Sequence, residues 1–436
     1  WDKVLALLPY DASSPLIFSS GLFLFLFAGF MLVYSMFRRA PMARIVYVIL
    51  FSLYFYYKSS GIYFLLLIFA ATSDYWIAKG IHAARSTRAK RWLVVLSVAV
   101  NLGMLGYFKY TNFLIDISNQ LFGQGFLQFR NIFLPVGISF FVFQSMSYTI
   151  DICRGQLKPL NNWADYLFYL SFFPQLVAGP IVRAKDFIPQ IRQNPLRVTR
   201  EMFGMGVFLI LIGLFKKAVI SDYISLNFVD RIFDEPLLYS GFECLMGIYG
   251  YALQIYCDFS GYSDMAIGIA LLLGFRFPKN FDAPYKSATI TEFWRRWHIS
   301  LSSWFRDYVY IPLGGSREGK ARTYLNLLAV WVLTGLWHGS TLNFLLWGLF
   351  LFVLIALERA GWDRVLDKSR VLSRVYMVLM IPLSWLLFAI PSVGRIGVYL
   401  GRLFPIVSRG VAVNAGDWLQ YGKQYWWLLV LGIVFS

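Results

Sequence analysis

Two of the chain's three histidines directly follow a tryptophan, and both pairs stand in or beside apolar sequence. His298 ends the stretch "TEFWRRWH", and His338 lies 40 positions later in "LTGLWHGSTLNF", which carries no acidic or basic residue besides the histidine. Histidine has the side chain whose unperturbed pKa suits a general base near neutral pH. In an apolar region it could take a proton from a hydroxyl group while bulk water is excluded. The structural alternative is a histidine bonded to a neighbouring carbonyl, whereas His82, in the basic stretch "KGIHAARSTRAK", is interpreted as a solvated residue.

The composition indicates a membrane setting for these histidines. Hydrophobic residues make up 58% of the 436 residues and charged residues 14%, against about 45–50% and about 25% in soluble domains. The uncharged run 323–357 is 35 residues long, while a helix that crosses a bilayer needs about 20. This run must therefore reverse or break, and Gly335 and Gly339, on either side of His338, are where we expect the break.

The apolar blocks predict ten to twelve membrane segments in an all-α integral membrane protein. Several blocks are short or contain Gly or Pro, so we expect re-entrant segments around an internal cavity, where protein covers the non-helical backbone. No polar linker separates the blocks, and we predict one membrane-embedded domain over residues 1–436. The chain does not begin with Met, and its last block is short, so we expect the natural protein to extend beyond both ends. The blocks lie at about 16–37, 45–57, 60–78, 92–108, 131–150, 166–180, 203–220, 238–256, 262–275, 323–357, 375–391 and from 425 onward.

The net charge of +17 is spread over short basic clusters between apolar blocks. This is the pattern of cytoplasmic loops and not of a nucleic-acid surface. It predicts that the first span runs from outside to inside and that residues 79–91 are cytoplasmic. The three cysteines, Cys153, Cys244 and Cys257, lack metal-ligand spacing, so we predict small buried residues and no metal site.

Residues 276–322 mix aromatic, charged and turn residues between two apolar regions. Thr289 and Glu292 form the pattern of a capping box that opens a helix. On that helix Trp294, His298 and two later apolar residues, Leu301 and Phe305, fall on one face. We therefore expect an interfacial helix with His298 directed inward.

The arginines of this region are expected at the membrane surface. Guanidinium groups bind phosphate oxygens in pairs, so Arg295, Arg296 and Arg306 could contact either lipid phosphates or a phosphate-bearing substrate.

Two carboxylates stand in the apolar sequence "QIYCDFSGYSDMAIG". Ionisable residues inside membrane segments are costly and are candidates for function. Asp258 and Asp264 could pair with Arg276, Arg295 or Arg296 and hold segments together. Alternatively they could orient a catalytic histidine or line a polar tunnel.

Three long motifs carry a resemblance to a known family. "YCDFSGYSDMAIG", "FPKNFDAPYKSATITEFWRRWHISLSSWFRDYVYIPLGG" and "RTYLNLLAVWVLTGLWHG" closely resemble the membrane-bound O-acyltransferase family, in its bacterial branch of alginate and peptidoglycan O-acetylation proteins. The teichoic-acid D-alanylation acyltransferase is a more distant relative. The resemblance covers most of residues 16–360 and is densest over 254–340.

The resemblance implies a bundle of about 11 transmembrane helices, with re-entrant and interfacial helices, around a central tunnel. An acyl thioester enters it from the cytoplasm, and an acceptor hydroxyl arrives from the other side. His338 in "LWHG" matches the family's principal catalytic histidine and His298 in "RRWHIS" its second. The sequence after Gly339 departs from many relatives, which leaves the acceptor preference open. Expected supporting or tunnel residues are Asp258, Ser260, Asp264, Trp297, Trp337 and Asn343.

The function so implied is transfer of an acyl group, most simply acetyl, from acetyl-CoA or an acylated carrier protein to hydroxyls of an extracytoplasmic polysaccharide. The alternative is transfer of D-alanyl or another acyl group from a carrier protein to a cell-envelope polymer. The expected location is the bacterial inner membrane, with no bound cofactor and with a periplasmic SGNH-hydrolase-like acetyltransferase as partner. The competing functions are a proton-coupled transporter or flippase, for which we find no paired halves, and a scaffold for a soluble transferase.

Overall fold

The computed structural model describes residues 7–37, 39–193, 197–403 and 416–435, and these residues form helices and loops without a β-strand. The predicted all-α membrane class is confirmed, because five helical stretches among them are long and apolar enough to cross a bilayer. They are Pro41–Ala83, Thr87–Phe122, Arg200–Asp234, Leu342–Asp367 and Arg370–Ala389.

The chain divides into two compact units, which are described separately. Unit 1 comprises Trp1–Ile212 and Tyr262–Pro278, and unit 2 comprises Gly213–Gly261 and Lys279–Ser436. The helices α10 and α13 contribute residues to both units. The single domain expected over residues 1–436 stays a prediction.

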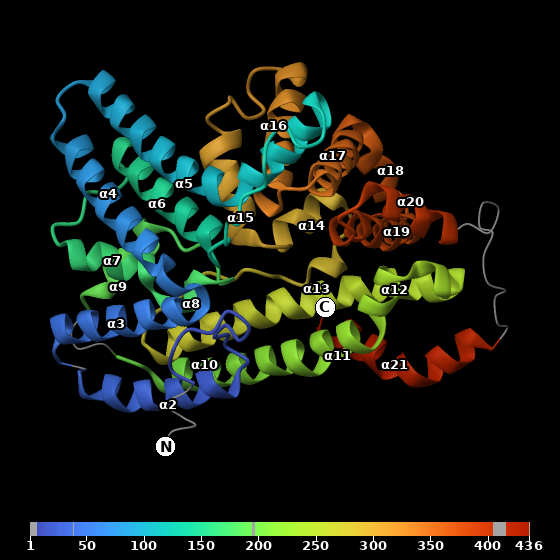
Figure 1. Ribbon diagram of the computed structural model, residues 1–436, viewed down its shortest axis with the longest axis horizontal. Helices are drawn as coiled ribbons and strands as arrows, with labels where there is room; N and C mark the ends of the chain where they lie inside the picture. Colours follow the sequence, from blue (N-terminus) through green and yellow to red (C-terminus); the bar gives the residue numbers. More distant parts are fainter. Residues whose placement is uncertain (1–6, 38, 194–196, 404–415, 436) are drawn as a thin grey trace. The chain divides into compact units, whose positions relative to one another are not determined.

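The helices of unit 1 begin at residues that suit helix starts. Ser20 and Ser86 accept hydrogen bonds from the first turns of α2 and α5, and Pro41 opens α3, as expected for helix N-termini. The helices are α2 (Gly21–Met36), α3 (Pro41–Ser60), α4 (Phe64–Ala83), α5 (Thr87–Phe122), α6 (Ile138–Cys153), α7 (Trp163–Ser171), α8 (Phe173–Leu176), α9 (Ala184–Ile191) and α10 (Arg200–Leu214) (Figure 1).

Short buried helices interrupt the apolar sequence of unit 1, as its Gly and Pro residues predict. A side chain at Gly137 would place Cβ 1.9 Å from the carbonyl oxygen of Leu176, so only glycine fits there. Beside it, α8 begins at Phe173, whose ring contacts Phe18 and Phe55 among other buried rings. The non-helical backbone after α8 is thus packed against protein, which satisfies the condition for such backbone in a membrane protein.

Unit 2 contains the two Trp-His motifs. Its segments include the π-helical η2 (Phe215–Ser221), η3 (Ser225–Val229), η6 (Arg306–Tyr310) and η7 (Glu358–Trp362). Its α-helices are α11 (Asp222–Ile224), α12 (Asp230–Asp234), most of α13 (Gly241–Leu272), α14 (Ile290–Arg296), α15 (Ile299–Phe305), α16 (Lys320–His338), α17 (Leu342–Leu357), α18 (Asp363–Asp367), α19 (Arg370–Ala389), α20 (Val393–Leu403) and α21 (Asp417–Phe435).

The uncharged run 323–357 breaks at the predicted glycine. Helix α16 ends at His338, Gly339 has extended backbone, and α17 begins at Leu342. The two helices pack side by side (Figure 1). Their approach is close because a Cβ at Gly335 would lie 2.5 Å from the carbonyl oxygen of Phe344, and one at Gly348 would lie 2.4 Å from that of Trp331. The glycines therefore allow backbone contact within this helix pair.

A cluster of tryptophans forms the core around this helix pair. Trp294 of α14 packs against Trp331 of α16 and Trp347 of α17, with ring centroids 5.1 and 5.5 Å apart. Trp297 packs against Trp385 of α19 at 4.8 Å. All five indoles are buried. They pack the segment that carries His298 against α16, which ends at His338, and against α17 and α19.

Candidate functional site

The helix that carries His298 is broken at the histidine itself. Its start is as predicted, because the Thr289 side chain accepts a hydrogen bond from the Glu292 N–H at 3.0 Å. The prediction of one continuous helix through His298 is wrong, however, since α14 ends at Arg296 and α15 begins at Ile299. His298 has left-handed backbone with φ 45° and ψ 54°, a conformation that costs a non-glycine residue about 1 kcal/mol or more. The expected apolar face nevertheless lies inward, since four residues are buried: Trp294, His298, Leu301 and Phe305.

Asn280 holds His298 in this strained position. The backbone N–H of Ile299 donates to the Asn280 carbonyl at 2.9 Å, and the Asn280 side-chain oxygen accepts from both the N–H and the hydroxyl of Ser300. Nδ1 of His298 lies 3.1 Å from the same oxygen. Because this amide atom receives a backbone N–H it must be oxygen, and Nδ1 of His298 must donate to it. Nε2 is then the nitrogen with the lone pair, and it can accept a proton or a hydrogen bond.

The environment of His298 keeps its ring neutral. The side chain is only 1% exposed, it lies outside the five candidate spans, and its ring is nearly perpendicular to that of Phe259 at a centroid distance of 4.7 Å. Removal from solvent disfavours the charged imidazolium, and burial therefore lowers the pKa of His298 to about 3. A neutral ring is the form in which Nε2 can act as an acceptor.

His338 is the last residue of α16 and stands among aromatic rings. Its ring centroid lies 4.9 Å from Trp337, 5.0 Å from Trp347 and 5.2 Å from Phe388. The ring of Trp337 also packs near that of His298, with the two ring centroids 6.0 Å apart. The structure therefore brings both motif histidines against one indole, although they are 40 residues apart.

Asn343 supports the His338 side of the site. It is buried at the start of α17, its amide donates to the carbonyl oxygens of Leu387 and Phe388 at 3.1 and 3.2 Å, and its side-chain oxygen accepts from Thr341. Asn343 therefore helps to fix the position of Phe388, whose ring packs against His338.

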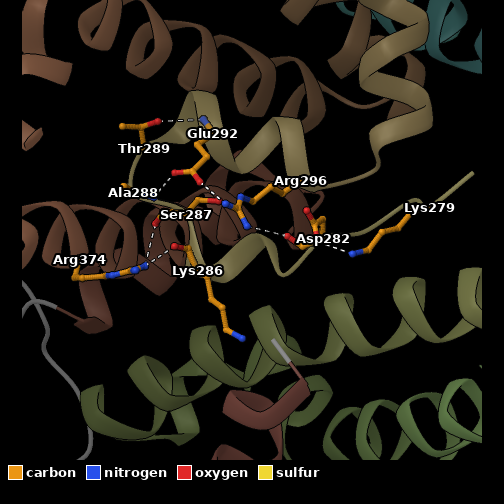
Figure 2. A network of polar contacts seen from close by, with 9 residues as sticks. All are labelled: Lys279, Asp282, Lys286, Ser287, Ala288, Thr289, Glu292, Arg296 and Arg374. Atoms are coloured by element: carbon orange, nitrogen blue, oxygen red, sulfur yellow. Dashed lines mark hydrogen bonds and ion pairs between the residues drawn. The ribbon is translucent and has the colours of Figure 1, made fainter.

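A polar network surrounds the start of α14. Glu292 accepts from the Ala288 N–H at 2.8 Å and pairs with Arg296 at 2.7 Å, while Arg296 also donates to the Asp282 carbonyl (Figure 2). Arg374 of α19 donates to the carbonyl oxygens of Lys286 and Ser287 (Figure 2). These contacts fix the chain that leads into the histidine segment.

The three arginines expected at a phosphate differ in their contacts. Arg296 is engaged by Glu292, and Arg306 pairs with the neighbouring Asp307 at 2.7 Å, which raises the pKa of Arg306. Arg295 and Arg306 are exposed, whereas Arg296 is half-buried. The exposed pair is better placed than Arg296 to meet an external phosphate.

The carboxylates predicted for the site are placed differently from what was expected. Asp258 forms an ion pair, but with Lys217 at 2.7 Å and not with an arginine, because α13 packs against the π-helical η2. Asp264 belongs to unit 1, and its link to the histidines stays a prediction. Ser260 and Trp297 are buried in unit 2.

Among the residues described, no three His, Cys, Asp or Glu side chains come together as a metal site would require. Cys153, Cys244 and Cys257 are free thiols. Cys244 and Cys257 are buried as predicted, whereas Cys153 is half-buried, so the prediction is wrong for that residue.

Sequence reasoning missed two residues of this site. Asn280 precedes its histidine by 18 positions in the loop "FPKNFD", and no spacing rule connects them. Glu358 is the acid that ends the uncharged run, and that position was a usable signal. Its carboxylate contacts the start of α14.

Fold and site together define a multi-pass, all-helical membrane protein with two histidines in an aromatic core. The model of the membrane-bound O-acyltransferase family matches residues 156–393, and the chain belongs to this family. It is therefore an O-acyltransferase.

Three kinds of relatives are similar to this chain. The probable alginate O-acetylase AlgI of Pseudomonas putida is 38% identical over 410 residues, covering 92% of this chain and 81% of the relative. The peptidoglycan O-acetyltransferase of Helicobacter pylori is 35% identical over 374 residues, covering 79% and 71%. The teichoic acid D-alanyltransferase of Bacillus subtilis is 29% identical over 240 residues, covering 52% and 59%.

Proposed function

We propose that this protein transfers an acyl group, most simply acetyl, from a cytoplasmic thioester to hydroxyls of an extracytoplasmic polysaccharide. The observation that carries the proposal is the pair of histidines on Trp337 in the aromatic core of unit 2. The names of the alginate and peptidoglycan O-acetylation relatives support acetyl and a polymer acceptor. We place the protein in the bacterial inner membrane, with about 11 spans around a central tunnel.

The chemistry needs a base at a site without bulk water. Attack of an acceptor hydroxyl on the thioester carbonyl releases the thiol, and a base that takes the hydroxyl proton contributes about 10²–10⁴-fold. Exclusion of water protects the thioester from hydrolysis. An imidazole surrounded by indole and phenyl rings meets both requirements.

The two histidines have different roles in this proposal. His338, at the break between α16 and α17, is the base that receives the hydroxyl proton. His298, with Nδ1 donating to Asn280, presents Nε2 as an acceptor, which suits the amide N–H groups of a pantetheine arm. Coenzyme A and an acylated carrier protein both provide such an arm, and Arg295 and Arg306 are the proposed contacts for its phosphate.

The alternative acyl group is D-alanyl, in keeping with the more distant D-alanyltransferase relative. It uses the same base and the same thioester chemistry, and so it changes the donor but not the roles of the histidines.

The test is transfer from labelled acetyl-CoA by the purified protein in liposomes, with a soluble sugar polymer present. We expect labelled ester on the acceptor from the unaltered protein and none from His338→Ala. Labelled donor moved into the liposomes without ester formation would instead identify a transporter. Unchanged ester formation by His338→Ala would contradict the proposed base.

A further inference from the structure

Glu358 lies at the junction of α17 and η7 and is only 2% exposed. One carboxylate oxygen accepts from the N–H of Ile290 at 2.6 Å and from the Tyr376 hydroxyl at 3.1 Å. The other accepts from the N–H of Thr291 at 2.9 Å and from its hydroxyl at 2.6 Å. The glutamate thus takes four hydrogen bonds, three of them from the first residues of α14.

This geometry suits a carboxylate at a helix N-terminus. The first N–H groups of a helix lack partners within the helix, and the helix dipole favours a negative charge there. The side chain of Thr289, the residue directly before α14, accepts a hydrogen bond from one of these N–H groups. Glu358 satisfies two more from a segment 67 and 68 residues away, so it caps α14 from outside.

Helix α19 adds contacts to the same short stretch. The Ser373 hydroxyl donates to the Ala288 carbonyl at 2.6 Å, and Arg374 donates to Lys286 and Ser287 (Figure 2). Residues 286–291 are therefore held between Glu358 and the first turns of α19.

The position of Glu358 links the two histidines. His298 follows α14, so the cap at Ile290 fixes the start of the helix that leads to it. Glu358 follows α17, and α17 begins four positions after His338. Helix α17 therefore runs from the turn after His338 to Glu358, which caps α14, the helix that precedes His298. The tryptophan cluster packs between α14 and α17.

We propose that Glu358 is a positioning residue that sets His298 relative to His338 by capping α14. The expected effect of Glu358 on activity rests on the proposed function, whereas the expected movement of His298 does not. Glu358→Gln keeps the size of the side chain, removes the charge and puts an N–H₂ group opposite donors. We expect α14 to shift and His298 to move with it.

The first readout is the imidazole nitrogen spectrum of the full-length protein in liposomes, labelled with ¹⁵N-histidine. The chain has three histidines, which His82→Gln, His298→Ala and His338→Ala assign. In Glu358→Gln the His298 signals should shift, and the His82 signals should stay in place. Glu243→Gln is the matched control, because Glu243 is a buried glutamate that accepts from the Ser240 N–H at the start of α13. It should leave the His298 signals unchanged.

The second readout is the kinetics of acyl transfer. Glu358→Gln should lower kcat by about tenfold or more, which corresponds to about 1.4 kcal/mol, with the donor KM within about twofold. Glu358→Asp, which keeps the charge, should restore part of the loss. A folded Glu358→Gln protein with unshifted His298 signals would overturn the inference.

Two further variants cover the case in which Glu358→Gln does not fold. Tyr376→Phe and Thr291→Ala each remove one hydrogen bond from the carboxylate and should shift the His298 signals by smaller amounts. Unshifted signals in both would also overturn the inference. If His298 shifts but His298→Ala transfers at the normal rate, the cap stands and the proposed role of His298 fails.

Discussion

At the scale of single residues, Asn280 decides which nitrogen of His298 carries the proton. Without its side-chain oxygen, Nδ1 loses its acceptor and the left-handed backbone at His298 loses support. Asn280→Ala should therefore lower kcat about fivefold, since one lost hydrogen bond is worth about 1 kcal/mol and a factor of ten would need about 1.4 kcal/mol. Rates measured beside Asn227→Ala, an exposed asparagine of unit 2, check this. Equal rates for both variants would contradict the orienting role.

Burial of neutral His298 predicts a pH dependence of stability. The folded pKa, about 3, lies below the unfolded value of about 6.5. Between these values the unfolded chain binds the additional proton, so stability is complete above pH 6.5 and falls as the pH is lowered. The loss from pH 7 to pH 5 should be about 2 kcal/mol.

Thermal unfolding in detergent at both pH values measures this loss. His298→Gln cannot take up the proton and should lose less stability over the same interval. A variant with the same pH dependence as the unaltered protein would assign the loss to other groups.

At the scale of elements, the pair α16 and α17 depends on glycines at its contact. A methyl group at Gly348 would lie 2.4 Å from the Trp331 carbonyl oxygen, so the helices would have to separate. Gly348→Ala should destabilise the protein by about 1–3 kcal/mol and lower transfer, because His338 ends the first of these helices. Gly103→Ala in α5, where a Cβ meets nothing within 4 Å, is the control and should keep the melting temperature in detergent. Equal melting temperatures for both variants would contradict the close contact.

Elements with local signals were predictable from the sequence, and those fixed by distant contacts were not. The Thr289 cap and the break at Gly339 follow from neighbouring residues, and both were predicted. The turn at His298 depends on Asn280, and the cap by Glu358 spans 68 residues, so helical periodicity could not reveal either. The ion pair of Asp258 was assigned to the wrong cation because Lys217 lies in a separate apolar block.

At the scale of the whole molecule, we propose that a second protein speeds the delivery of acyl groups to the polymer. We propose a periplasmic SGNH-hydrolase-like transferase for this step, as the family resemblance implies, and it would deliver acyl groups to the polysaccharide. The purified chain should then acetylate polymer slowly, and adding that partner should raise the rate at least tenfold. Rates compared with and without the partner test this, and a full rate from the chain alone would contradict it.

The central claim is that His338 is the base of acyl transfer to an exported polysaccharide. The most direct test is the O-acetyl content of the cell's exported glycans after replacing the native residue by His338→Ala. His82→Ala, at an exposed histidine, is the matched control. Loss of O-acetyl groups with His338→Ala alone, at equal protein levels, is the predicted result. Unchanged O-acetyl content at normal levels of the His338→Ala protein would contradict the account.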